Sequence, residues 1–166
     1  CSFDDQVPNQ ASGLQVRLGA KKAASMDVNT ACTSFLYSLS TANAMIRTGV
    51  VRNAVVLGGE LISQFMDWRN RNVAVLFGDG CAAVVLQATE REEGRLAERL
   101  GCDAEGRDTL VVRGMGGRYA DLSRRYGVTD WVFEGQEIFR RAVTGMSAAA
   151  ADVLARRGLT ADDIDL

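Results

Sequence analysis

An apolar segment passes into a long helix-forming segment at Asp27-Val28-Asn29-Thr30-Ala31-Cys32-Thr33-Ser34-Phe35-Leu36. The residues just before this junction, 23–28, predict a short buried strand. Asn29 and Thr30 are residues that commonly cap helices. Residues 31–48 contain few helix breakers and carry apolar side chains nearly all round, which predicts a helix buried on most sides. Gly49 follows and is expected to end that helix.

Outward from this junction, the pattern of apolar residues predicts further elements on both sides. Residues 6–19 predict a helix that Gly19 stops. Residues 53–60 contain the continuous apolar run 54–59, typical of a strand covered on both faces. A polar loop at 66–72 and the turn Gly78-Asp79-Gly80 precede a second apolar strand at 81–86.

The later part of the chain changes character. Residues 89–98 are rich in charge and indicate a surface connection. We expect a strand at 110–113, a flexible loop at 114–117 and a long helix at 135–157. Strands without alternation, separated by helices, predict an α/β layered fold with helices on both faces of a sheet. The change near residues 89–94 is the best candidate for a domain boundary.

Composition excludes several classes of protein. The chain has 166 residues, is 47% hydrophobic and 24% charged, and carries a net charge of −2. This is a globular composition, and the charge gives no reason to expect nucleic acid as a partner. No apolar run approaches the roughly 20 residues of a membrane span, and no secretory signal is visible. We therefore expect a cytoplasmic protein whose four cysteines stay reduced, although their even number permits disulfides.

Histidine is absent from the sequence. A complete Ser-His-Asp or Cys-His-Asn site is therefore excluded within these residues. Without histidine or clustered cysteines, a metal site has no support. The chain opens on Cys1 rather than Met, so we expect it to be a segment of something longer.

Cys32 is the candidate nucleophile. It is predicted to lie at the first turn of the helix, where unsatisfied N–H groups and the positive end of the helix favour a thiolate. Thiolate is the form that thioester exchange requires. By itself the signal is weak, because a cysteine on an apolar helix is more often a small core residue.

Four blocks in order resemble one known family. They are residues 27–39, with Cys32 at their centre, Val55-Val56-Leu57-Gly58-Gly59-Glu60, residues 76–86, and Gly135-Gln136-Glu137-Ile138-Phe139. Together they resemble the 3-oxoacyl-[acyl-carrier-protein] synthase III enzymes (beta-ketoacyl-ACP synthase III) of the thiolase superfamily. The resemblance covers nearly the whole chain and is loosest at 91–129.

The resemblance implies a thiolase-like layered α/β/α/β/α fold with two similar halves, assembled as a homodimer. Residues 1–90 would be the later part of the N-terminal half, and residues 91–166 the beginning of the C-terminal half. This chain would then be a central fragment of the fold.

The resemblance also implies an acyltransferase of fatty acid biosynthesis that needs no cofactor. Cys32 would take an acyl group from acyl-CoA, and malonyl-acyl-carrier protein would then be decarboxylated and condensed with it. The family's catalytic histidine and asparagine are expected beyond Leu166, so the fragment alone is predicted to be inactive. No membrane and no nucleic acid are expected as partners.

Other positions match the family singly. Arg71 matches the arginine that meets the adenine end of coenzyme A, where a guanidinium can stack and pair with phosphate. Arg140 matches a basic position that docks the acidic carrier protein. Val7 matches a position that crosses the dimer interface and closes the partner's acyl pocket. The remaining matches line the pantetheine channel: Asn72, Val75, Leu76, Phe77, Phe133, Gly135, Phe139 and Ala142. Without the resemblance, these would read as ordinary core residues or solvated charges.

The sequence departs from the family at a few positions. Ser34 stands where glycine is usual and adds bulk beside Cys32, and Cys81-Ala82 stands where Ala-Gly is common. Val7 is smaller than the aromatic residue often found there, which leaves room for a longer acyl primer. Three alternatives stay open: a related ketosynthase of secondary metabolism (quinolone-type), a non-catalytic subunit of the superfamily, and a purely structural α/β domain.

Overall fold

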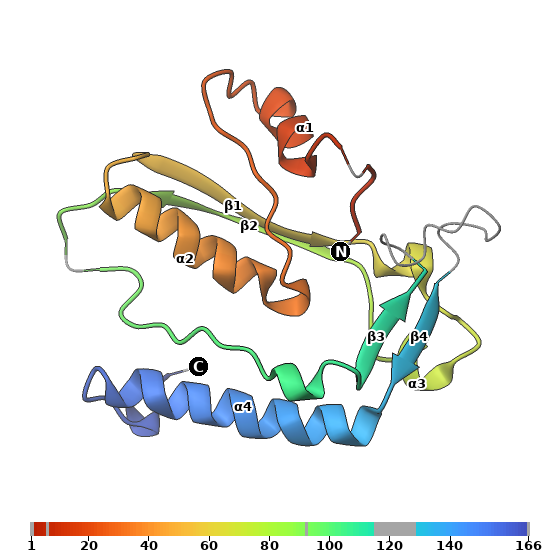
Figure 1. The fold of residues 1–166 in the computed structure, drawn as a ribbon. Coiled ribbons are helices and arrows are strands. Elements are labelled where there is room, and N and C mark those ends of the chain that lie inside the picture. The colour runs from red at the N-terminus through yellow and green to blue at the C-terminus, as the bar shows by residue number, and fades with distance from the viewer. Residues whose placement is uncertain (1, 6, 92, 115–128, 166) are drawn as a thin grey trace. The chain divides into compact units, whose positions relative to one another are not determined.

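The computed structural model describes residues 2–5, 7–91, 93–114 and 129–165 (Figure 1). The chain divides into two compact units, the first formed by residues 1–64 and 78–88, the second by 65–77 and 89–166. The elements of the first unit are α1 (Gln10–Arg17), η1 (Ala31–Thr33), α2 (Ser34–Arg47), β1 (Asn53–Glu60) and β2 (Gly80–Gln87). The short helix η2 (Ile62–Phe65) leads into the second unit, which contains α3 (Arg71–Ala74), η3 (Ala104–Gly106), β3 (Leu110–Arg113), β4 (Asp130–Phe133), α4 (Gly135–Ala155) and η5 (Ala161–Asp163).

The first unit is built on the antiparallel pair β1–β2. Its register runs without a break from Asn53 opposite Gln87 to Glu60 opposite Gly80. Both strands were predicted, β1 with the same bounds and β2 one residue shorter at each end. The cover on both faces that the apolar run indicates is not observed, since Val56 alone in β1 is buried within the described chain.

Helix α2 lies along this pair of strands (Figure 1). A Cβ atom placed on Gly58 of β1 would lie 3.3 Å from Cδ2 of Phe35, so glycine allows α2 to approach the strand closely. Ala42 of α2 and Val56 of β1 are the buried core residues of this contact. Phe35 lies three residues after Cys32. The packing of the Phe35 ring on β1 therefore also positions the turn that contains the candidate nucleophile.

The predicted helix 31–48 is largely confirmed, with two differences. It opens with the single 3₁₀ turn η1 and not with regular helix, because Ala31 has a φ of +51°. It is also less buried than predicted, since Ala42 alone in α2 is buried within the described chain and Leu36 is 56% exposed. Most of its other residues are half-buried, and Leu36, Ala44 and Arg47 are exposed. Gly49, with a φ of +76°, ends the helix as predicted.

The predicted strand at 23–28 is wrong. Among the described residues, this segment joins no strand ladder, and most of it is exposed. One side chain of this segment holds it in place. The carboxylate of Asp27 accepts hydrogen bonds from the backbone N–H groups of Gln10 at 2.8 Å and Ala11 at 2.9 Å. These are free N–H groups at the start of α1, so Asp27 joins the segment to that helix. Helix α1 itself was predicted, and Gly19 stops it with a φ of +65°.

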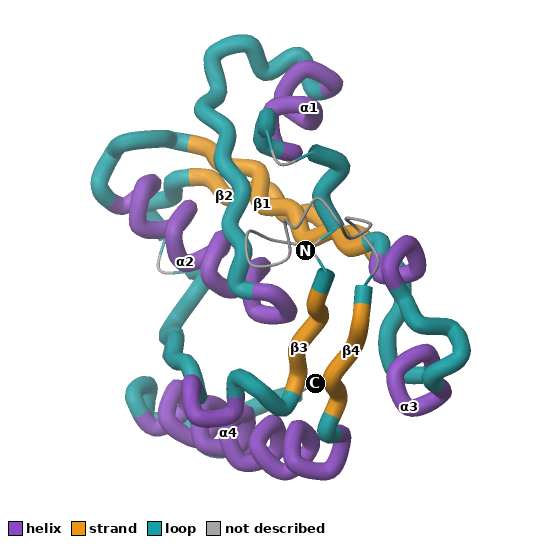
Figure 2. Tube along the Cα trace, turned by 45° about the vertical axis from the view of Figure 1, so that its right-hand side comes forward, coloured by secondary structure: helices purple, strands orange, loops and turns teal. Residues whose placement is uncertain are grey.

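The second unit contains the antiparallel pair β3–β4, which Figure 2 shows side by side. The register runs from Leu110 opposite Phe133 to Arg113 opposite Asp130. Strand β3 was predicted, and β4 was missed. The predicted loop at 114–117 falls outside the described residues from position 115 onward. Within the part of the chain that is described, no helix is long and apolar enough to cross a membrane.

The Phe65 carbonyl and aromatic ring both connect residues 65–77 to β4. The backbone oxygen of Phe65 accepts a hydrogen bond from Oγ1 of Thr129 at 2.7 Å and another from Nε1 of Trp131 at 3.0 Å. The Phe65 and Trp131 rings stack with their centroids 6.3 Å apart. The segment that carries α3 is thereby fastened to a strand more than 60 positions later in the chain.

Helix α4 was predicted at 135–157 and is observed at Gly135–Ala155. Two arginines tie the charged connection before η3 to it. Arg99 Nη1 donates to the carbonyl of Ala148 at 3.3 Å, and Arg156 Nη1 donates to the carbonyl of Glu98 at 3.2 Å. The surface connection predicted at 89–98 forms no helix or strand in its described residues, and its end is bonded to α4.

The close contact at Gly58 gives a testable prediction. Gly58→Val should lower the free energy of unfolding of the intact protein by about 1–3 kcal/mol, because the new side chain must push against Phe35. Valine has a high propensity for β-strands, so a loss of stability would come from the clash with Phe35 and not from a low strand propensity of the new residue. Urea unfolding followed by circular dichroism measures the change.

Gly13→Ala is the matched control, since nothing lies within 4 Å of a Cβ placed there in α1. It should leave stability unchanged or raise it by up to about 1 kcal/mol. If Gly58→Val is as stable as the wild type, the close packing of α2 on β1 is refuted.

Candidate active site

Cys32 lies in η1 and is exposed within the described part of the chain. Ala31 before it is held in the left-handed region, which L-residues rarely adopt outside functional or strained turns. Side chains brace this turn from both sides: Asn29 Oδ1 accepts from the N–H of Ala31 at 3.2 Å, and Thr33 Oγ1 donates to the carbonyl of Thr30 at 2.9 Å. The thiol is thus presented at a bend directly before regular helix begins.

Six of the predicted coenzyme A residues line one hollow in the second unit. Its volume is about 470 Å³. The lining residues come from α3 with the two residues after it and from the junction of β4 with α4: Arg71, Asn72, Val75, Leu76, Phe133 and Gly135, joined by Gln136. Residues that are about 60 positions apart in the sequence therefore share one cavity.

Helix α3 presents its residues to this hollow because its other side is anchored. Asn70 caps the helix by accepting a hydrogen bond from the N–H of Asn72 at 3.1 Å. Val73 is fully buried. With Val73 fixed inside, Val75 and Leu76 are left 74% and 63% exposed. Such apolar exposure beside an arginine suits a ligand with an apolar arm and a charged end.

Gly135 and Phe133 shape the opposite wall. A Cβ placed on Gly135 would lie 3.0 Å from Cε1 of Phe133, so glycine leaves room for that ring. Phe77 contacts the ring edge-on, with centroids 6.0 Å apart, and also contacts Trp131 at 5.2 Å. Phe77 therefore supports Phe133 from an aromatic cluster and is not among the residues that line the hollow.

The other predicted residues lie elsewhere. Phe139 and Ala142 are on α4, where Phe139 is 70% exposed, and neither lines the hollow. Val7 belongs to the first unit and is 84% exposed. Gln136 was missed as a lining residue, although it adjoins Gly135 in the fourth family block. Trp131 was missed too, because a lone tryptophan in a short strand has no periodic signal.

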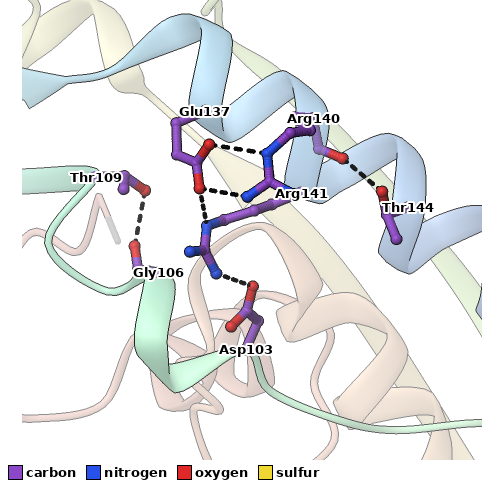
Figure 3. Close-up of polar contacts among 7 residues, drawn as sticks. All are labelled: Asp103, Gly106, Thr109, Glu137, Arg140, Arg141 and Thr144. Atoms are coloured by element: carbon purple, nitrogen blue, oxygen red, sulfur yellow. Dashed lines mark hydrogen bonds and ion pairs between the residues drawn. The ribbon is translucent and has the colours of Figure 1, made fainter.

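Arg140 belongs to a cluster of charges at the start of α4 (Figure 3). The carboxylate of Glu137 accepts hydrogen bonds from Arg140 Nε at 2.9 Å and Nη2 at 2.6 Å, and from Arg141 Nε at 2.7 Å. Arg141 Nη1 reaches further, to a carboxylate oxygen of Asp103 at 2.6 Å. Its side chain passes over Gly106, where a Cβ would lie 3.0 Å from Cδ of Arg141.

These hydrogen bonds change the acid–base properties of the cluster. The guanidinium groups of Arg140 and Arg141 stabilise the Glu137 carboxylate and lower its pKa from 4.5 to about 2. The hydrogen bonds to Glu137 raise the pKa of Arg140, and those to Asp103 and then Glu137 raise the pKa of Arg141. Arg140 is therefore an arginine held by a neighbouring carboxylate, with 63% of its side chain still exposed.

A second hollow of about 470 Å³ lies in the first unit. Polar residues such as Ser2, Glu60 and Asp79 line it, together with Cys81. Cys32 lines neither hollow. Since Cys81 stands on β2 and not at a helix start, this hollow lacks the setting that activates a thiol.

Comparison with known proteins supports the family resemblance. Residues 26–104 match the family described as 3-oxoacyl-[acyl-carrier-protein (ACP)] synthase III. A beta-ketoacyl-[acyl-carrier-protein] synthase III 2 of Vibrio cholerae serotype O1 is 47% identical over 166 residues, which cover 100% of this chain and 46% of the relative. The chain thus spans about half the length of the curated relatives it matches.

Solved structures that resemble this chain include the same kind of enzyme as its sequence relatives. The crystal structure of 3-oxoacyl-(acyl carrier protein) synthase III from Pseudomonas aeruginosa PAO1 matches 98% of this chain and 49% of its own, with a TM-score of 0.85 and 31% identity. The priming beta-ketosynthase of the R1128 polyketide biosynthetic pathway matches 99% of this chain and 48% of its own, with a TM-score of 0.86 and 28% identity. These matches confirm the predicted α/β fold. The chain corresponds to about half of each matched structure.

The Glu137 cluster predicts a pH dependence. A carboxyl whose pKa is lowered on folding contributes stability that is fully present above its ordinary value of 4.5 and is lost as the pH falls through about 2. The hydrogen bonds of Glu137 to Arg140 and Arg141 within α4 should therefore persist at pH 4 and weaken near pH 2. A ¹³C NMR titration of the Glu137 carboxyl carbon should give a midpoint near 2.

Arg141→Gln should move that midpoint upward, because one of the two guanidinium partners is removed. Glu134→Gln, a change just before α4, should leave it where it is. A midpoint near 4.5 in the wild type would contradict the ionic cluster.

Proposed function

The chain is similar along its whole length to the 3-oxoacyl-[acyl-carrier-protein] synthase III enzymes, and on this premise we propose that its protein condenses acyl-CoA with malonyl-acyl-carrier protein. The products are a 3-oxoacyl-carrier protein and CO₂, in fatty acid biosynthesis. One observation carries the proposal: Cys32 lies within the matched residues 26–104 and is exposed at the start of α2. An accessible thiol before a helix is the setting that a thioester-exchanging nucleophile requires.

In the first step, the sulfur of Cys32 attacks the carbonyl carbon of the acyl-CoA thioester. The bond from that carbon to the sulfur of coenzyme A breaks, and coenzyme A leaves as its thiol. The acyl group remains on Cys32 as a new thioester. The exchange needs no oxidant and no metal, since one thioester replaces another.

The hollow of the second unit fits the coenzyme A part of that substrate. Arg71 offers a planar guanidinium that can stack on adenine and pair with phosphate. Val75, Leu76 and Phe133 offer an apolar wall for the pantetheine arm. The proposal therefore assigns binding to the residues of this hollow and chemistry to Cys32.

The second step uses groups outside this chain. A histidine and an asparagine supplied by the rest of the protein would assist loss of CO₂ from malonyl-carrier protein. The resulting carbanion attacks the acyl-Cys32 carbonyl, which forms the new carbon–carbon bond and releases the sulfur of Cys32. Arg140 would dock the carrier protein, and Val7 would close the acyl pocket of a partner subunit in a homodimer.

A ketosynthase of secondary metabolism is the alternative function. The similarity to the R1128 priming ketosynthase, with a TM-score of 0.86 and 28% identity, supports this alternative. Both functions begin with an acyl group on Cys32, and they differ in the second substrate.

The direct test is a condensation assay on the full-length protein with acyl-CoA and malonyl-acyl-carrier protein. We expect 3-oxoacyl-carrier protein and CO₂ from the wild type, none from Cys32→Ala, and a normal yield from Cys102→Ala. Acyl transfer to Cys32 without any reaction of malonyl-carrier protein would favour the alternative. Product from Cys32→Ala would contradict the proposal.

The role of Arg71 is tested separately. Arg71→Leu should raise KM for acyl-CoA by about 10- to 100-fold, because a hydrogen bond to a charged group contributes about 1.5–3 kcal/mol. The value of kcat should change little, since Arg71 does not contact the reacting thioester in this proposal.

Arg69→Leu is the matched control. It removes an arginine from the same loop whose side chain is 96% exposed and which does not line the hollow. Its KM should equal that of the wild type. Equal effects of the two substitutions would show that only the general positive charge of the loop matters.

A further inference from the structure

We infer that Ser34 is a positioning residue whose hydroxyl fixes the turn that presents Cys32. The inference rests on the proposed function of Cys32 as the acyl acceptor, and it concerns a position where this sequence departs from the glycine usual in the family. The sequence suggested only added bulk at Ser34. The structure shows a directed pair of hydrogen bonds instead.

The Ser34 hydroxyl makes two hydrogen bonds to the backbone just before Cys32. Its Oγ donates to the carbonyl oxygen of Ala31 at 2.7 Å and accepts from the N–H of Thr30 at 2.8 Å. One hydroxyl can do both, because it has one donor and two acceptor sites. The two backbone groups lie on either side of the peptide that joins Thr30 to Ala31.

That peptide leads into the strained residue of the turn. Ala31 has a φ of +51° without being glycine, a conformation that persists only when the surroundings hold it. If Ala31 relaxed to an ordinary helical conformation, its carbonyl and the Thr30 N–H would no longer both face Ser34. The Ser34 bonds therefore oppose this relaxation, and with it a change in the direction of the Cys32 side chain.

The neighbouring hydroxyl of Thr33 does not do the same. Thr33 Oγ1 donates a hydrogen bond to the carbonyl oxygen of Thr30 at 2.9 Å. It also lies 3.2 Å from the Thr30 hydroxyl, so both of its partners belong to the residue before Ala31. Of these two hydroxyls, that of Ser34 is the one that bonds to Ala31. The position of Cys32 should therefore depend on the Ser34 oxygen.

The experiment compares Ser34→Ala, which removes the hydroxyl, with Ser34→Thr, which keeps it. In the full-length protein, Ser34→Ala should lower kcat for acyl-enzyme formation about fivefold or more, the loss expected when a structural hydrogen bond is removed. KM for acyl-CoA should stay constant, because the hollow that would bind it is built from other residues. Ser34→Thr should restore the wild-type rate.

A second readout does not depend on the proposed function. The rate of Cys32 alkylation by iodoacetamide, followed by peptide mass spectrometry, should fall in Ser34→Ala and recover in Ser34→Thr. If Cys32 of the wild type is alkylated but never acylated, the proposed function fails while the alkylation rates still judge the role of Ser34.

Thr48→Ala is the matched control. It removes a hydroxyl that bonds to the carbonyl of Ala44 at 2.9 Å, at the far end of α2 from Cys32. It should change neither rate. The inference is overturned if Ser34→Ala is alkylated as fast as the wild type, or if Ser34→Thr is as slow as Ser34→Ala, because the hydroxyl would then not be the group that matters.

Discussion

The carbonyl oxygen of Phe65 is the anchor on which the candidate coenzyme A site depends. Thr129 and Trp131 both donate hydrogen bonds to it, and the stacked rings of Phe65 and Trp131 shield the contact. These interactions fasten residues 65–77 to β4. Together with the ring contacts of Phe77 to Trp131 and Phe133, they place Arg71 of α3 beside the same hollow as Phe133.

The nucleophile depends on a different constraint. Its setting is a strained backbone turn, held by short side chains within a few residues, and by the packing of Phe35 on Gly58. Binding and chemistry thus follow from two kinds of interaction, an aromatic long-range contact and a local polar one. This separation explains why substitutions in the hollow are expected to alter affinity and those in the turn to alter rate.

The sequence predicts elements well where the signal is local. Strand β1 was predicted with the correct bounds because the unbroken apolar run 54–59 is flanked by the polar residues Asn53 and Glu60. The ends of α1 and α2 were predicted because Gly19 and Gly49 can adopt the positive φ that stops a helix. Strand β4 was missed, although β3 has the same length of four residues and was predicted.

Non-local features were harder to predict. The segment 23–28 has the apolar residues of a strand, but a strand also needs a neighbour, which composition does not reveal. Six of the candidate binding residues were predicted only through the family resemblance, since no periodicity joins Arg71 to Phe133. The partner of Arg140 was within reach: Glu137 stands three residues earlier on the same helix, a spacing that commonly forms ion pairs.

The central claim is that Cys32 is the acyl acceptor. The most direct measurement is peptide mapping by mass spectrometry after the full-length protein has been incubated with acyl-CoA. The acyl mass should appear on the peptide that contains Cys32, although Cys81 and Cys102 are exposed as well. An acyl group on Cys81 or Cys102, with Cys32 unmodified, would contradict the account.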